Sequence, residues 1–416
     1  MASMRIPAAV LLVLLAALGR AFAADTELEA AIRKYLALPT ATDRDDMAPE
    51  LAPFDATPVE ELTKALQCVM PQPGGPGPLE RRVMTNKGEI RYVVELPEGY
   101  DPAKAYPVFL FMMGPTTQPE DGLLTWPTKK LGERYIVAAP AMPADDQDFQ
   151  GYPKYDTGDV AMEAIFNDLG RAAHIDPSRV IVGGFSMGGA FSWSAAAIQA
   201  DRVAASIPMS CNPPNDVQPE CLRNLLHVPM FITHGTLDQI TNVRLARDAA
   251  DLLKQYGYPS EFREIPGVGH VWPEVLEPEM MKWMEGKKRV LFPKEVVYHI
   301  LHWGRPKRRM YWVEATKGKY SLDGPDGKKV FAGIVGKIDG NRIELTTSLV
   351  EKLTVYLNSS LVDLSKEVVI VVNGEERHRG IVKPSLRVAL EGFRERWDPE
   401  DVYSAKVLLE GLWTPK

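Results

Sequence analysis

Three residues in this chain have the types and the order that nucleophilic hydrolysis needs: a serine, an aspartate and a histidine. Ser186 lies in the stretch Gly184-Phe185-Ser186-Met187-Gly188. An apolar run precedes this stretch and a run of small residues follows it, which predicts a buried strand, a sharp glycine-flanked turn and a helix. Such a turn holds the hydroxyl where a substrate and a base can both reach it.

Asp238 and His270 follow further apolar runs. The stretch Phe231-Ile232-Thr233-His234-Gly235-Thr236-Leu237-Asp238 places a carboxylate in the loop after a predicted strand, and Pro266-Gly267-Val268-Gly269-His270 places an imidazole in a glycine-rich loop after the next one. A serine hydroxyl is a poor nucleophile at neutral pH and needs a base that a carboxylate orients. The two downstream residues can supply that pair, and we interpret His234 as structural.

The length and composition indicate two soluble domains behind an export signal. The chain has 416 residues, 45% of them hydrophobic, and a formal charge of −7. Residues 1–23 have a basic start, an apolar centre and the cleavage pattern Ala21-Phe22-Ala23, so we expect a signal peptide and a secreted or periplasmic protein. An uncleaved anchor is the alternative. Cleavage would lower the formal charge to about −9, which disfavours a nucleic-acid partner.

Four segments are expected along the chain. Residues 24–77 are a helical segment that ends in a proline- and glycine-rich linker. Residues 78–287 alternate strands with helices, which predicts a mostly parallel sheet covered on both faces and active loops at the carboxyl ends of its strands. In this part Asp176-Pro177-Ser178-Arg179 is interpreted as a turn that leads into the strand before Ser186. Residues 288–416 contain short strands, hairpin turns and one helix at 385–396, which predicts a mainly antiparallel β-rich module.

Residues 78–287 resemble the α/β-hydrolase family, in particular its lidless secreted esterases related to polyhydroxybutyrate depolymerases, feruloyl esterases and carboxylesterases. The resemblance rests on the three motifs quoted above, in the order serine, aspartate, histidine. It implies Ser186 as the nucleophile, His270 as the general base and then acid, and Asp238 as the residue that orients His270. It also implies an oxyanion hole made by the N–H of Met187 and an N–H near Gly114.

The oxyanion loop departs from the family pattern. Where the family has a His-Gly pair, this chain has Met113-Gly114-Pro115, and proline has no N–H to donate. The second donor is then Gly114, a neighbour such as Thr116, or absent. Loss of one donor costs roughly 10²–10³ in turnover, so a catalytically silent binding protein is a rival interpretation.

Several further residues are less specific. Trp126 and Trp272 fall in loops at the active edge and could contact an acyl or aryl group, although packing is the ordinary role of each. The tryptophans of the β-rich module, among them Trp312 and Trp397, could form a carbohydrate platform or belong to a core. Cys211 and Cys221 could form a disulfide or remain thiols. No cofactor is expected, and no metal site, because cysteine and histidine show no ligand spacing.

The sequence therefore predicts a secreted serine esterase that cleaves short-chain or polymer-linked carboxylic esters through an acyl-enzyme. We expect the mature chain to make no stable membrane insertion. A peptidase of the same fold and a silent hydrolase-fold binding protein are the alternatives.

Overall fold

The fold is taken from a computed structural model that describes residues 26–70, 79–85, 88–115, 117–123, 131, 134–142, 156–213, 219–300, 309–323 and 329–413, without side chains at 88, 156–160 and 219–221. The predicted signal peptide, the linker at 71–78, Thr116 and Trp126 lie outside these ranges. Within them, no helix combines the length and the apolar character that a bilayer crossing requires.

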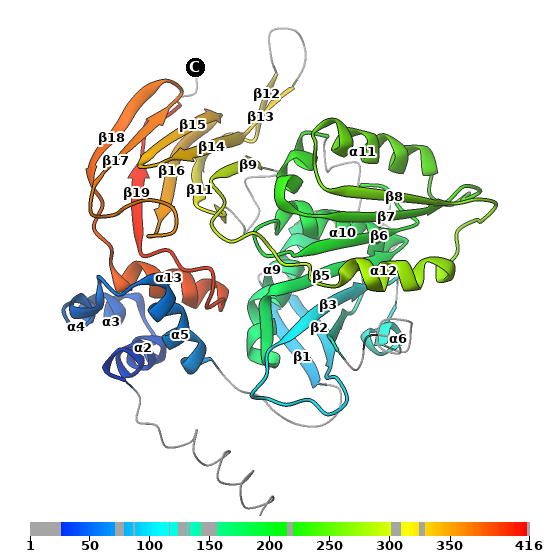
Figure 1. The fold of residues 1–416 in the computed structure, drawn as a ribbon, viewed down its shortest axis with the longest axis horizontal. Coiled ribbons are helices and arrows are strands. Elements are labelled where there is room, and N and C mark those ends of the chain that lie inside the picture. The colour runs from blue at the N-terminus through cyan, green and yellow to red at the C-terminus, as the bar shows by residue number, and fades with distance from the viewer. Residues whose placement is uncertain are drawn as a thin grey trace, which may run out of the picture.

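The centre of the molecule is an eight-stranded sheet in the order β1-β2-β4-β3-β5-β6-β7-β8 (Figure 1). The hairpin β1-β2 pairs antiparallel with β4, and every pair from β4 to β8 is parallel. The strands are β1 (Leu79–Thr85), β2 (Gly88–Glu95), β3 (Tyr106–Met112), β4 (Ile136–Pro140), β5 (Ile175–Phe185), β6 (Ala205–Met209), β7 (Met230–Gly235) and β8 (Ser260–Ile265).

Both faces of this sheet are buried, because successive side chains of its apolar strands point to opposite sides. In β3, Val108 and Leu110 enter one core with α9, α10 and α11, whereas Phe109 and Phe111 enter a second core with α12. The predicted sheet with helices on both faces is confirmed. The helices between and after the strands are α6 (Pro119–Leu123), α9 (Asp156–Ala172), α10 (Met187–Ile198), η2 (Pro219–His227), α11 (Val243–Gln255), η3 (Glu274–Leu276) and α12 (Glu277–Met284).

The start of β5 differs from the prediction. Instead of a turn before the strand, β5 already begins at Ile175 and pairs with Tyr106 of β3. The Asp176 side chain still accepts a turn-like hydrogen bond from the Ser178 N–H at 3.0 Å. The register with β3 shifts between Tyr106 and Val108. The turn-forming residues are therefore accommodated as an irregularity inside the strand.

The C-terminal part is β-rich and mainly antiparallel, as predicted. A five-stranded sheet, β18-β17-β15-β14-β9, contains one parallel pair, β15-β17, and faces a four-stranded sheet, β10-β11-β16-β19. Trp312 is fully buried between the two sheets, where it packs on Gly336 of β14. The elements are β9 (Glu295–His299), β10 (Arg309–Met310), β11 (Val313–Gly318), β12 (Ser321–Asp323), β13 (Lys329–Phe331), β14 (Gly333–Asp339), β15 (Arg342–Ser348), β16 (Val350–Leu357), β17 (Glu367–Val372), β18 (Glu375–Ile381), α13 (Leu386–Arg396) and β19 (Ala405–Leu409).

The N-terminal helices pack on the C-terminal helix α13, although more than 300 residues separate them in sequence. Leu62 and Leu66 share a core with Leu390 and Phe393. Chain ends far apart in sequence thus form one structural unit beside the central sheet (Figure 1). The helices are α2 (Glu27–Ala37), α3 (Ala41–Asp46), α4 (Ala48–Leu51), η1 (Ala52–Phe54) and α5 (Val59–Val69).

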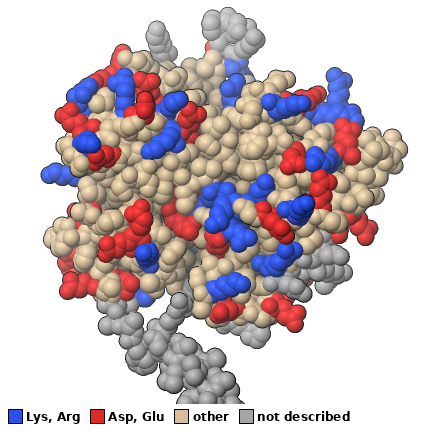
Figure 2. All heavy atoms as spheres, viewed as in Figure 1, with Lys and Arg blue, Asp and Glu red and all other residues tan. Residues whose placement is uncertain are grey.

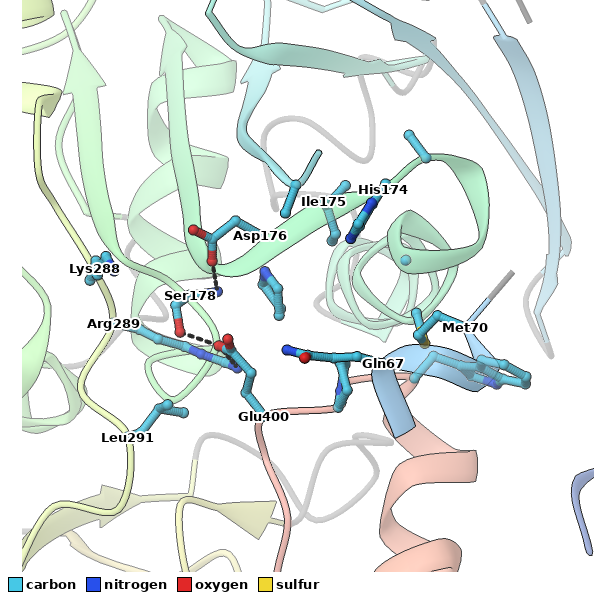
Figure 3. Close-up of a pocket in the computed structure, with 16 residues that line it drawn as sticks. Gln67, Met70, His174, Ile175, Asp176, Ser178, Lys288, Arg289, Leu291 and Glu400 are labelled. Carbon is cyan, nitrogen blue, oxygen red and sulfur yellow. Dashed lines mark hydrogen bonds and ion pairs between the residues drawn. The ribbon is translucent and has the colours of Figure 1, made fainter. Parts of the chain in front are cut away.

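A cavity of about 450 Å³ lies where α5, the start of β5, the segment after α12 and the loop after α13 meet. Figure 3 shows Gln67 pointing from α5 toward Glu400 and Arg289, and the Ser178 hydroxyl donating to Glu400. The cavity belongs to the junction between the parts of the chain, at the amino end of the central sheet.

On the face drawn in Figure 2, acidic and basic side chains are intermixed, with one group of Lys and Arg near the middle.

Candidate active site

Ser186 sits at the tip of a strained turn between β5 and α10. Its φ is 58° and its ψ −123°, a conformation that a non-glycine residue adopts only when the surroundings enforce it. The Ser186 N–H donates to the Met209 carbonyl of β6 at 2.9 Å, which fixes the turn to the neighbouring strand. The hydroxyl is thereby held at the carboxyl edge of the sheet, where the motif predicts it.

The glycines of the motif are required by close backbone contacts. A Cβ on Gly184 would lie 2.3 Å from the Gly188 backbone, and a Cβ on Gly188 would lie 2.1 Å from the Met112 carbonyl oxygen. A Cβ on Gly189 would lie 2.5 Å from Cys211 Sγ. These distances are far below any real contact, so the turn and α10 can press against β3 and β6 only because these positions have no side chain.

The structure brings Ser186, His270 and Asp238 into one hydrogen-bonded chain. His270 Nε2 lies 2.9 Å from Ser186 Oγ, and His270 Nδ1 lies 2.8 Å from Asp238 Oδ2. The two loops meet because the end of β7 approaches the histidine loop closely: a Cβ on Gly235 would lie 2.4 Å from the Val268 carbonyl oxygen. The Leu237 N–H donates to that same carbonyl at 2.8 Å.

The side chain of Asp238 is fully buried and is held by neutral donors. Its Oδ1 accepts the N–H groups of Ile240 and Thr241, each at 2.9 Å, and Thr241 Oγ1 lies 2.9 Å from Oδ2. Burial acts to raise the pKa of Asp238, but the hydrogen bonds from Thr241, His270 and Ile240 outweigh it and lower that pKa below its ordinary value. Asp238 is therefore a carboxylate at neutral pH.

His234 and Thr241 stand behind the triad, and sequence reasoning did not single out Thr241. His234 is fully buried, with Nε2 3.1 Å from the Thr241 carbonyl oxygen and 3.3 Å from Asp238 Oδ2. Burial lowers the pKa of His234, so its ring is neutral at neutral pH. The Thr241 hydroxyl also lies 2.9 Å from the Ser210 carbonyl oxygen. Both residues fix the Asp238 carboxyl group. The sequence indicates this only through their proximity, since His234 lies four residues before Asp238 and Thr241 three residues after it.

The oxyanion region lies beside the serine. Met187 is the first residue of α10, so its N–H belongs to the helical turn that has no intrahelical acceptor. Met112 of β3 pairs with Gly184 of β5, so Gly114 and Ser186 each lie two residues past this pair, beyond the ends of their strands. The Gly114 carbonyl accepts the Thr117 hydroxyl at 2.8 Å. Met187 therefore follows the end of β5 and Gly114 the end of β3, and their role as oxyanion donors stays a prediction.

The other predicted residues are placed as follows. Trp272 is partly buried, packs edge-on against Phe111 and near Phe185, and donates its indole N–H to Glu277 at 2.7 Å. Trp272 thus packs near Phe185, and the ring of Phe185 lies 5.0 Å from that of His270. Trp272 is linked to His270 through this phenylalanine. Cys211 is a buried free thiol, so of the two alternatives the structure has the thiol and not the disulfide with Cys221. Its side chain points at α10 rather than into the loop that follows it.

Comparison with known proteins agrees with this fold. A family model described as phospholipase/carboxylesterase matches residues 160–285. The chain is 30% identical over 125 residues to acyl-protein thioesterase 1 of Neurospora crassa, covering 28% of this chain and 50% of that one. It is 26% identical over 118 residues to the protein of the same name in Candida albicans, covering 27% and 51%. The chain thus spans about half the length of these relatives.

Solved structures of similar fold include a thermostable esterase at 19% identity and a TM-score of 0.40, covering 51% of this chain and 63% of that one. A ferulic acid esterase from Anaeromyces mucronatus has 19% identity and a TM-score of 0.39, covering 48% and 86%. The sheet order, the serine turn and the family match lead to one assignment. The central domain has the α/β-hydrolase fold, and its residues 160–285 are similar to the phospholipases and carboxylesterases.

Proposed function

We propose that this protein hydrolyses carboxylic esters or thioesters through an acyl-enzyme on Ser186. The observation that carries the proposal is the continuous hydrogen-bond chain from Ser186 Oγ through His270 to the buried Asp238 carboxylate. The matched family and the thioesterase relatives support the same class of chemistry.

In the first half-reaction, Ser186 Oγ attacks the carbonyl carbon while its proton passes to His270 Nε2. The imidazolium that forms keeps its Nδ1–H on Asp238, whose negative charge stabilises it. His270 then gives the Nε2 proton to the leaving alkoxide or thiolate. In the second half-reaction, water attacks the acyl group on Ser186, with His270 again as the base.

The negative charge on the carbonyl oxygen needs donors that are already in place. The Met187 N–H at the start of α10 is one, and the positive end of the helix favours the same charge. We propose Gly114, just after β3, as the second donor, because Pro115 has no N–H to donate. This incomplete family pattern favours a hydrolase of activated esters over a peptidase, since amides need stronger stabilisation of the oxyanion.

The rim of the site is apolar. Leu237, Ile240 and Val271, which neighbour Asp238 and His270 in sequence, are 61%, 74% and 54% exposed. Isolated exposed aliphatics are ordinary, but three on the two loops of one site indicate contact with an apolar group. We propose that this rim contacts the acyl chain. Polymer-linked substrates, and the export expected from residues 1–23, stay predictions.

The test is hydrolysis of 4-nitrophenyl acetate, butyrate and octanoate and of a matching thioester, with Ser186→Ala beside the wild type. We expect kcat/KM to fall by about 10⁴ or more in the variant. Ser194→Ala, on the same helix, is the matched control and keeps full activity. A fluorophosphonate probe labels the wild type and not Ser186→Ala. Equal, background-level rates in both proteins without labelling would refute the proposal, and amide cleavage faster than ester cleavage would favour the peptidase.

A further inference from the structure

A second cleft, of about 760 Å³, lies where the ends of α2 and α9 meet α3 and α13. None of the triad residues lines it. Its lining includes four arginines, Arg44, Arg171, Arg387 and Arg394, in a chain whose formal charge is −7. A group of cations gathered from three distant segments of an acidic protein calls for a physical reason, because like charges repel.

The cleft is also lined by three carboxylates, Asp45, Glu391 and Glu395, and Arg387 pairs with the first two. Most of the carboxylates near Arg44, Arg171 and Arg394 are bound to other donors. Asp168, three residues before Arg171, accepts two hydrogen bonds from Arg81, at 2.9 and 2.8 Å, and one from Tyr92 at 2.7 Å. Glu391, three residues before Arg394, accepts Arg387 on one oxygen and Lys406 on the other, both at 3.0 Å. Asp168 is therefore not left to pair with Arg171 on α9, and Glu391 is not left to pair with Arg394 on α13.

The same holds for Asp45 and Asp398. Asp45 accepts Arg387 at 2.5 Å, so it does not neutralise the adjacent Arg44, which donates to the Leu38 carbonyl at 3.0 Å. Asp398 is bound to Arg289. Among the described residues that line the cleft, Glu395 is the carboxylate without a hydrogen-bonded cation. Three guanidinium groups in the same lining, those of Arg44, Arg171 and Arg394, have no carboxylate partner.

Arg171 is also held in place for binding. Its guanidinium lies over the Trp397 ring, 4.2 Å from the centroid. Trp397 is itself fixed at the end of α13, in the left-handed conformation with φ 49°, by its N–H bond to the Phe393 carbonyl. Burial lowers the pKa of Arg171; the charge of Asp168 opposes this effect, and those of Arg81 and Arg394 add to it. A guanidinium stacked on an aromatic ring keeps its N–H groups in one plane, available to an oxyanion.

We propose that this cleft binds a phosphate group, as inorganic phosphate or as the monoester of a small soluble molecule. Arg171 and Arg394 supply planar N–H pairs that match phosphate oxygens, and Arg44 adds charge. The site is independent of the proposed hydrolase activity. Because it joins the N-terminal helices to α9 and α13, an occupant would also stabilise their contact.

The experiment is isothermal titration of the full chain with sodium phosphate and with phenyl phosphate, at constant ionic strength set with NaCl. We expect saturable binding at one site, weakened at least about tenfold by Arg171→Gln and by Arg394→Gln. Arg171→Lys keeps the charge but loses the planar pair, so it binds with intermediate affinity. Arg244→Gln, which changes an exposed arginine on α11, is the matched control and binds as the wild type does. Esterase rates and circular dichroism confirm that each variant is folded.

Binding of phenyl phosphate but not of inorganic phosphate would identify a monoester as the ligand, and the reverse would identify the free ion; either supports the proposal. Absence of saturable binding by the wild type overturns it. Unchanged affinity in both glutamine variants also overturns it, because the anion would then bind elsewhere.

Discussion

The buried carboxylates at the two ends of the central sheet have different partners. At the carboxyl end, one buried carboxylate, Asp238, is held by N–H and hydroxyl groups and faces a histidine. At the amino end, where the parts of the chain meet, buried carboxylates are bound directly by buried arginines. The pairs there are Arg289 with Asp398 at 2.8 Å, Arg396 with Asp201 at 2.8 Å and with Asp401 at 2.5 Å, and Arg309 with Asp401.

The difference follows from what each charge has to do. A permanent cation beside Asp238 would neutralise it and leave little attraction for a transient imidazolium, whereas neutral donors keep the carboxylate ionised and its charge available. At the junction no charge changes during function, so a direct pair is the arrangement that limits the cost of burial. The same residue types thus serve the proposed catalysis at one end and cohesion at the other.

The largest expected effect is at the carboxyl end. Asp238→Asn should lower kcat/KM for 4-nitrophenyl butyrate by about 10⁴, because an amide N–H₂ favours the tautomer of His270 that cannot accept the serine proton. Asp248→Asn, which changes an exposed carboxylate on α11, should leave the rate unchanged. A loss below tenfold in Asp238→Asn would show that the two ends do not differ as described.

At the junction the expected loss is in stability and not in chemistry. Arg289→Met leaves the Asp398 carboxylate buried and unpaired, which should lower the free energy of unfolding by about 3–5 kcal/mol in urea titration. The double variant Arg289→Met/Asp398→Leu should be more stable than this single variant, because no buried charge is left unpaired. Its kcat should equal that of the wild type. If the double variant were less stable than Arg289→Met, the Asp398 side chain would contribute to stability through interactions other than its pairing with Arg289.

A smaller effect is expected in the dependence of stability on pH. The pKa of His234 is lowered by burial, so between that value and the ordinary value of about 6.5 the unfolded chain binds a proton that the folded chain does not. The stability is fully present above about pH 6.5 and falls as the pH drops, with a slope of at most about 1.4 kcal/mol per pH unit for one proton. Urea titrations from pH 7.5 to 5 of the wild type and of His234→Asn should show that the variant lacks this slope. Equal slopes would assign it to another group.

The smallest effect concerns the apolar rim. Leu237→Ser with Val271→Ser should raise KM for the octanoate ester by about two- to tenfold and leave the acetate ester unchanged, because only a long acyl chain can cover these side chains. Val335→Ser, on the exposed face of β14, is the control. An equal change for both esters would mean that the substitutions disturb the triad instead of the contact with the acyl chain.

Much of the catalytic end could be predicted because its determinants are local. Glycines at 184 and 188, a serine between them and an apolar run before them specify the strand, the turn and the helix. The order of Asp238 and His270 after two further apolar runs follows from the alternation of strands and helices. The strand at Ala405–Leu409 and the helix ending at Arg396 also agree with the prediction, since their periodicity is strong.

Contacts between distant segments could not be predicted. Nothing in the sequence pairs α5 with α13, Arg289 with Asp398, or Arg171 with Trp397, because each of these contacts depends on the path of a long chain and not on a local pattern. Thr241 was missed for the same reason: a threonine in a loop becomes a partner of Asp238 only when the loop folds back on it. The sequence by itself determined the reactive groups and the elements that carry them. Only the tertiary structure decided which charges are paired and which guanidinium groups are left open to a ligand, since pairing depends on distances that a linear pattern does not contain.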